Sequence, residues 1–376
     1  MTTKKENVPN YWDYLKLADV LQLQGGLEED ETQLETDELH FIITHQSLEL
    51  WFKLILAELR AARDHLDSPN LPEEQVPRVV YHLHRVVAIL RLSTQTFSVM
   101  ETLTPQDFMS FRDKLTPASG FQSFQMREIE LILGIDWASR VKYGSTDPLD
   151  HIRKLAKDSP AGELALGRIE SVLKETSLRR SLHKWLYRTP IQGSMPHQEN
   201  DSQAVDSFLE NYLSSIQEHH EMQIGRLIAS SVAPEKEVRA RFAGQFQSAK
   251  EYIYAHDIEK EEDKEFTKRY RAALIFIESY RELPLLAWPR TLIDSIVELD
   301  SEMVMFRHRH ARAVERIIGR RVGTGGSSGV NYLDKTTQIR IFTNLWSVRT
   351  LLLPKRYRPD VDNADVYTFQ GEPKNI

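Results

Sequence analysis

The chain has 376 residues, 41% of them hydrophobic and 27% charged, and a formal net charge of −7, which is the composition of a soluble globular protein. Its basic residues form no stripe that would attract a phosphate backbone, and no window approaches the ~18 apolar residues of a membrane span, so we expect a cytoplasmic protein that binds neither nucleic acid nor membrane. Because the chain has no cysteine, disulfides, thiolate nucleophiles, iron–sulfur clusters and covalent haem attachment are excluded, and any metal must be held by the 13 histidines or by carboxylates.

Apolar residues recur at steps of three and four and almost no segment alternates over the length of a strand, which predicts an all-α fold. The expected helices cover residues 38–66, 74–100, 122–134, 161–188, 202–231, 235–257, 261–283, 288–318 and 334–353. No repeat or linker is visible, so residues 1–376 are expected to form one domain. The stretch from about 200 to 265 is more charged than its flanks and is expected to be an accessory helical insertion outside the main core.

Near the N-terminus, Tyr11 and Tyr14 in YWDYLKL predict an amphipathic helix that must dock on another surface. The helix expected at 38–66 carries an apolar stripe at steps of three and four, made of Phe41, His45, Leu48, Phe52, Ile55 and Leu59. A histidine therefore interrupts a row that faces the core. It is either a core histidine satisfied by hydrogen bonds or part of a ligand pocket.

The next segment, Thr102 to Gln125, contains Pro105, Pro117 and Gly120 and is expected to be irregular. It places Arg112 among aromatic residues. A guanidinium in such surroundings can clamp a substrate carboxylate in a bidentate fork, although a loop arginine is also commonly just solvated.

The helix expected at 288–318 repeats the pattern of the first stripe, because Ile296, Leu299, Met303, Phe306, His310, Ala313 and Ile317 share one face. His310 therefore points inward, whereas His308 lies about 200° round the helix and should face water. Two inward histidines on long helices favour a haem or ligand pocket between helices. Neither Glu-x-x-His on two helices, as a di-iron carboxylate bundle needs, nor H-E-x-x-H, as a zincin needs, occurs in the chain.

A glycine-rich segment follows directly, in which five of the 16 glycines lie between Gly319 and Gly329. The segment, GRRVGTGGSSG, matches neither nucleotide-binding pattern, since it lacks the lysine of a Walker A loop and the third glycine of G-x-G-x-x-G. It can serve as a lid or nest over an anion or amino acid, or simply as an exposed connection.

Four blocks of the chain resemble tryptophan 2,3-dioxygenases, in the order of that family: YWDYLKLADVLQLQ, DELHFIITHQSLELWFK, ETLTPQDFMSFRDKLTPASGFQS and FRHRHARAVERIIGRRVGTGGSSGVNYL. The blocks span roughly residues 11 to 340, and the second and fourth are long and specific. The middle third resembles the longer family members only loosely.

The resemblance implies a helical-bundle haem-dioxygenase fold that binds one haem b per subunit, with O2 as co-substrate. It makes His310 the proximal ligand of the haem iron and places Ser119 at the haem edge. It places His45 in the distal pocket beside the indole N–H of the substrate, as the catalytic residue that orients the indole rather than as an obligatory base.

For the substrate, L-tryptophan, the resemblance implies that Arg112 pairs with the carboxylate and that Thr324 contacts the amino acid backbone groups. The remaining substrate-binding residues that it implies are Phe41, Ile42, Ile43, Thr44 and Phe108. Tyr11 and Tyr14 match tyrosines that reach a neighbouring subunit's active site, in a homotetramer built as a dimer of dimers.

The implied reaction cleaves the indole C2–C3 bond of tryptophan with O2 and gives N-formyl-L-kynurenine, the first step of tryptophan catabolism by the kynurenine pathway. One alternative is a related haem oxygenase of secondary metabolism that acts on a modified tryptophan. Another is a haem-binding sensor or scaffold without turnover. The presence of Arg112 and Thr324 beside both histidines argues against a sensor, which needs no amino acid clamp.

Overall fold

The computed structural model describes residues 10–69, 71–135, 153, 156–157, 159–230, 233–325 and 328–369. Within these ranges the chain forms α-helices and short 3-10 helices, and no strand of a sheet, so the predicted all-α fold is confirmed. No helix in the described part of the chain is both long and apolar enough to span a bilayer.

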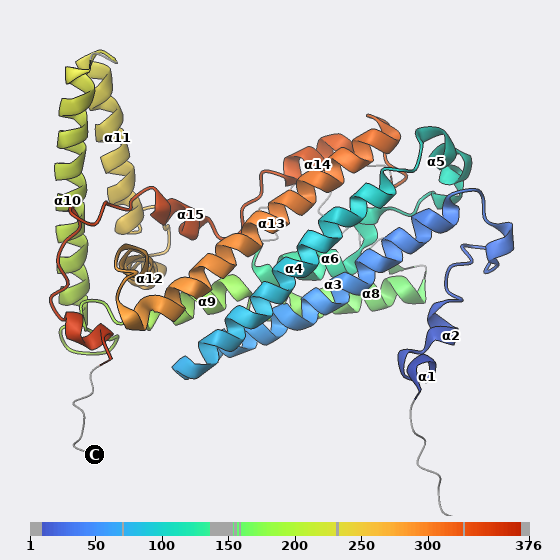
Figure 1. The fold of residues 1–376 in the computed structure, drawn as a ribbon, viewed down its shortest axis with the longest axis horizontal. Helices are drawn as coiled ribbons and strands as arrows, with labels where there is room; N and C mark the ends of the chain where they lie inside the picture. Colours follow the sequence, from blue (N-terminus) through green and yellow to red (C-terminus); the bar gives the residue numbers. More distant parts are fainter. Residues whose placement is uncertain are drawn as a thin grey trace, which may run out of the picture.

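Three long helices form the body of the molecule: α3 (Glu38–Asp67), α4 (Val76–Met100) and α13 (Ala287–Ile318) (Figure 1). Their apolar stripes supply most of the core; on α3, Phe52, Ile55 and Leu59 are buried while Lys53 is exposed. The shorter helices α6 (Phe124–Leu133), α8 (Pro160–Val172), α9 (Leu178–Tyr187) and α14 (Val330–Thr336) lie alongside this body. The stripes predicted for 38–66 and 288–318 thus coincide with α3 and α13.

One helix predicted as continuous, 161–188, is interrupted in the structure. It consists of α8 and α9, and the Ser177 side chain caps α9 by accepting a hydrogen bond from the amide of Arg180 at 3.2 Å. The cap satisfies a backbone N–H that a helix start leaves without a partner, so it stabilises a new helix at this point.

The helix predicted at 334–353 is also two helices, α14 and α15 (Thr343–Arg349). The cause is tertiary: the fully buried carboxylate of Asp300 on α13 accepts hydrogen bonds from the amide of Ile341 at 3.0 Å and from the Trp346 indole at 2.6 Å. These bonds hold the connection in a non-helical path. The segment predicted to be irregular contains one short α-helix, α5 (Pro105–Phe111), which the Thr104 side chain caps, and 3-10 turns at Arg112–Leu115 and Gly120–Gln122.

The stretch predicted to be accessory forms α10 (Asp201–Ala229), α11 (Glu235–Ile253) and the start of α12 (Glu261–Ser279). Figure 1 shows α10 and α11 standing as a pair at the end of the molecule opposite α5 and α14. The first half of α10 is buried through Val205, Phe208 and Tyr212, whereas most of α11 is exposed.

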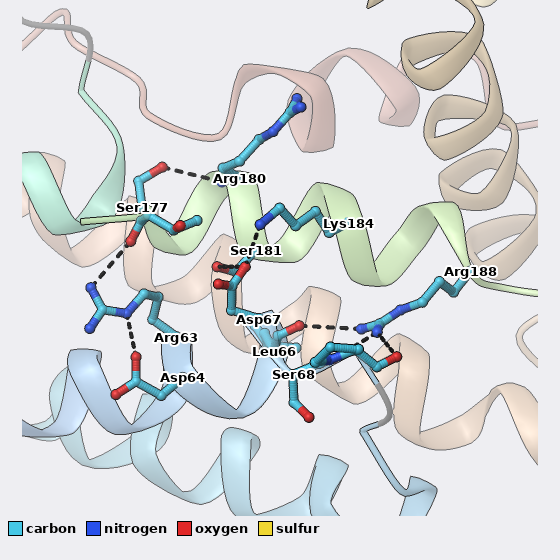
Figure 2. Close-up of polar contacts among 12 residues, drawn as sticks. Arg63, Asp64, Leu66, Asp67, Ser68, Ser177, Arg180, Ser181, Lys184 and Arg188 are labelled. Atoms are coloured by element: carbon cyan, nitrogen blue, oxygen red, sulfur yellow. Dashed lines mark hydrogen bonds and ion pairs between the residues drawn. The ribbon is translucent and has the colours of Figure 1, made fainter. Parts of the chain in front are cut away.

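The end of α3 is fastened to α9 by polar contacts (Figure 2). Asp67 accepts hydrogen bonds from Lys184 at 2.7 Å and Ser181 at 3.3 Å, and Arg188 donates to the carbonyl of Ser68 at 2.7 Å. Burial alone would raise the pKa of Asp67, but the hydrogen bonds from Lys184 and Ser181 and the positive charges of Lys184 and Arg63 together outweigh it and lower that pKa. This junction holds α3 in place from the end remote from α5.

Candidate functional site

A cavity of about 260 Å³ lies where the start of α3, the end of α4 and the end of α13 meet α5, α6 and α14. Its walls are mainly apolar. Seven residues singled out from the sequence line it: Phe41, His45, Phe108, Arg112, Ser119, His310 and Thr324. Residues far apart in the chain therefore converge on one pocket at the end of the molecule away from α10 and α11.

His45 faces this cavity in a defined tautomer. Its Nδ1 lies 2.8 Å from the carbonyl oxygen of Phe41, one turn earlier on α3. Since a carbonyl only accepts hydrogen bonds, Nδ1 carries the proton and Nε2 is left as an acceptor. His45 lines the cavity, and burial lowers the pKa of its imidazole, so the ring is neutral.

His310 enters the same cavity from α13, one turn after Phe306, while His308 is exposed. Burial lowers the pKa of His310 to about 4, and the nearby positive charge of Arg127 acts in the same direction. The Phe97 ring on α4 is stacked on the imidazole, with centroids 5.3 Å apart and planes 12° from parallel. A neutral imidazole in apolar surroundings is suited to ligate a metal.

Arg112 begins a 3-10 turn directly after α5 and is half-buried. Its Nη2 donates to the carbonyl of Val322 at 2.6 Å. Its Nε is buried and has no hydrogen-bond partner among the described residues. The guanidinium thus presents an unsatisfied donor in a cavity whose wall includes the Phe108 ring.

The glycine-rich segment closes over the Arg112 segment. The Thr324 hydroxyl donates to the carbonyl of Ala118 at 2.5 Å. A Cβ on Gly325 would lie only 2.8 Å from the Cβ of Ser119, so the two backbones approach to a distance that only glycine allows. Both segments contribute residues to the cavity wall, as expected of a lid or nest rather than of a simple exposed connection.

A buried group of charged residues in the cavity wall escaped the sequence analysis. Arg127 pairs with Glu130 at 3.0 Å, and Arg307 lies 3.6 Å from the same carboxylate and donates to the carbonyl of Ile339 at 3.1 Å. Arg127 Nε and Arg307 Nη2 are buried without a hydrogen-bond partner in the described part of the chain. The sequence did contain a signal for Arg307: it lies three residues before His310 on the same helix, and residues at that spacing lie on the same side of a helix.

Five residues expected at the substrate do not line this cavity. Thr44 is buried and Ile43 is 48% exposed, because successive residues of a helix point about 100° apart and only Phe41 and His45 share the inward face. Ile42 is likewise absent from the wall. Tyr11 and Tyr14 lie on the short helix α1 (Tyr11–Leu15), with 70% and 77% of their surface exposed.

Comparisons with known proteins place these features in context. Residues 2–352 match the family model described as tryptophan 2,3-dioxygenase. A relative of that name from Sorangium cellulosum is 43% identical over 369 residues, covering 96% of this chain and 88% of the relative. "Tryptophan 2,3-dioxygenase 2" from Ralstonia nicotianae is 44% identical over 371 residues, covering 96% and 98%. A "tryptophan 2,3-dioxygenase-like protein" from Xanthomonas campestris is 43% identical over 275 residues, covering 72% of this chain and 99% of the relative.

Proposed function

Because the chain belongs to the tryptophan 2,3-dioxygenase family, we propose that it cleaves the indole C2–C3 bond of L-tryptophan with O2 to give N-formyl-L-kynurenine, the first step of the kynurenine pathway. The observation that carries the proposal is the convergence of His45, Arg112 and His310 on one apolar cavity. Each of the three belongs to a different one of the sequence blocks that resemble the family.

The cavity fits a haem b, which is the cofactor that we infer. The neutral His310 is available to ligate iron, and apolar side chains such as Phe52 and Phe306 suit the porphyrin faces. The unsatisfied Nε of Arg127 and Nη2 of Arg307 suit the two carboxylates that a haem carries. Ser119 is the candidate contact at the haem edge. When bound, the haem supplies the O2 chemistry that no amino acid side chain in the cavity provides.

The remaining wall suits the substrate. Arg112 Nε, which lacks a partner among the described residues, is placed to donate to the carboxylate of tryptophan, and Thr324 is placed to contact the amino acid backbone groups. His45 Nε2 accepts the hydrogen bond of the indole N–H, while its Nδ1–H stays on the carbonyl of Phe41. His45 therefore orients the indole without changing its own charge. Phe41 and Phe108 provide apolar surface beside it.

We infer a homotetramer, a dimer of dimers, in which α1 of one subunit docks on another. The α1 side chains Tyr11, Trp12 and Tyr14 are largely exposed in the single chain. A second exposed apolar stripe runs along α3 at helical spacing, formed by Leu39, Ile43, Leu50 and Leu54. Because each chain carries both surfaces, α1 of each of two subunits can pack on the α3 stripe of the other. We further propose that residues 1–376 act as one domain, with α10 and α11 as an accessory element.

The alternative substrate, a modified tryptophan, is not favoured by relatives that are named for tryptophan and match nearly the whole chain. The deciding experiment supplies haem during expression, reduces the purified protein and adds L-tryptophan with O2. We expect a Soret band and N-formylkynurenine. Haem without product would contradict the proposed substrate, and a panel of substituted indoles would then identify the one accepted. Folded protein unable to bind haem would overturn the role of His310.

A further inference from the structure

Two histidines face one cavity, but they are held in different ways. The His45 ring is fixed by the hydrogen bond from its Nδ1 to the carbonyl of Phe41, four residues earlier. The described residues give His310 no hydrogen bond, not even to the carbonyl of Phe306, four residues before it. Instead the His310 ring lies parallel to Phe97 at 5.3 Å and is tilted by 38° against Phe306 at 6.3 Å.

The aromatic rings around His310 support one another. Phe97 and Phe306 have centroids 5.3 Å apart, and Phe52 packs edge-on against Phe306 at 5.8 Å. Phe97 is only 5% exposed, so its ring has little freedom to move. Because a stacked ring restricts the rotation of the imidazole, this packing does the positioning that a hydrogen bond does for His45.

The carboxylates that line the cavity are engaged elsewhere. Glu130 is paired with Arg127 at 3.0 Å, and Glu49 accepts a hydrogen bond from Gln125 at 2.8 Å. Arg127 is also close enough to His310 to disfavour positive charge on it. Most metal-ligating histidines donate their second N–H to a carboxylate or carbonyl, which makes the imidazole a stronger donor to the metal. The surroundings of His310 offer an aromatic face and a nearby cation in place of such an acceptor.

We propose that Phe97 is a positioning residue that orients the His310 imidazole by stacking without itself offering a hydrogen-bond acceptor, and so favours the ferrous state of a bound haem. This rests on the proposed function, since it concerns the ligand of the inferred haem. A weaker imidazole donor stabilises ferric iron less, and ferrous iron is the state that binds O2.

The test compares two substitutions at Phe97 with a matched control in haem-loaded protein. Phe97→Gln introduces an amide oxygen that can accept from the imidazole N–H, and Phe97→Leu removes the stacked ring without adding an acceptor. Phe208→Leu is the control, because Phe208 is also buried and packs edge-on against another phenylalanine, Phe276, but does not line the cavity. The measurements are haem content, the ferrous iron–histidine stretching frequency by resonance Raman, and the Fe(III)/Fe(II) midpoint potential.

We expect Phe97→Gln to raise the iron–histidine frequency and lower the midpoint potential at unchanged haem content. Phe97→Leu should broaden the iron–histidine band and leave the midpoint potential near that of the wild type. Phe208→Leu should change neither the iron–histidine band nor the midpoint potential. The proposal is overturned if the wild type already shows the iron–histidine frequency of Phe97→Gln. It is also overturned if Phe97→Leu leaves the iron–histidine band unchanged, and this second test does not depend on whether Phe97→Gln folds. A wild-type protein that takes up no histidine-ligated haem refutes the proposed function instead.

Discussion

Replacing Arg112 by glutamine tests how the site recognises an amino acid. In the wild type, Nη2 of the guanidinium donates to the carbonyl of Val322, and the buried Nε has no hydrogen-bond partner among the described residues. A substrate carboxylate would accept the hydrogen bond that Nε can donate. Hydrogen bonds between charged groups contribute about 1.5–3 kcal/mol each. Two such bonds to one carboxylate correspond to roughly 3–6 kcal/mol, and because Arg112 is only half-buried we expect the lower end.

At about 1.4 kcal/mol per factor of ten, that loss lowers kcat/KM for L-tryptophan roughly 100-fold. The assay measures N-formylkynurenine formation, together with the dissociation constants of L-tryptophan and of tryptamine, which lacks the carboxylate, from the shift of the Soret band. The wild type should bind tryptophan far more tightly than tryptamine, and the variant should bind the two with similar affinity.

Lys114→Gln is the matched control. Lys114 is a cation of the same turn, but it pairs with Glu38 at 3.1 Å and does not line the cavity. Its loss should leave the preference for tryptophan over tryptamine unchanged. An Arg112→Gln variant that still distinguishes the two ligands as the wild type does would refute the carboxylate clamp.

Three further predictions concern other residues. His310→Gly should lose haem and regain it with added imidazole; full haem content without imidazole would contradict the ligand role. His45→Ala should retain haem and lose activity. Burial lowers the pKa of His45 below the usual 6.5, so kcat/KM of the wild type should fall on the acid side with a midpoint below pH 6.5. A midpoint above pH 6.5 would contradict this role of His45. The hydrogen bond from Arg358 lowers the pKa of Glu282 from 4.5 to about 2, so this carboxylate stabilises the fold above pH 4.5 and loses its contribution as the pH falls toward 2. Glu282→Gln should therefore be less stable than the wild type in urea at pH 7, by a margin that narrows below pH 4.5; a constant margin would exclude the ion pair as the cause.

Helical periodicity alone located the long helices and chose His310 over His308, since an uninterrupted apolar stripe fixes which face is inward. It failed where distant residues decide the backbone path. The buried carboxylate of Asp300 ends the helix predicted at 334–353 through contacts that no local pattern contains. The cap at Ser177 was a local signal, but the continuing apolar spacing concealed it.

For the site too, local sequence patterns predicted some residues, and others depend on contacts between distant parts of the chain. Arg112 and Thr324 drew attention through unusual local composition, which already allowed a carboxylate clamp at Arg112, whereas the contact of Thr324 with the amino acid backbone groups came only from the family resemblance. Arg127 and Arg307 were overlooked because charged residues on amphipathic helices usually face water. Both pair with Glu130, which lies on the same helix as Arg127 but on a different helix from Arg307. Ile43 was expected in the pocket from the family resemblance, but it is 48% exposed, because residues close in sequence on a helix face different directions.

The order of α3, α4 and α13 in the chain has a consequence for how the protein folds. α3 and α4 are adjacent in sequence and can pair early, because little chain entropy is lost in bringing them together. α13 docks on α4 through contacts such as Arg91 with Glu298, 207 residues apart, so this pairing must wait for a long loop to close. The cavity needs both events, because His45 lies on the early pair and His310 on the late helix. Haem uptake during refolding should therefore lag behind the gain of helical signal and mark the last step of assembly.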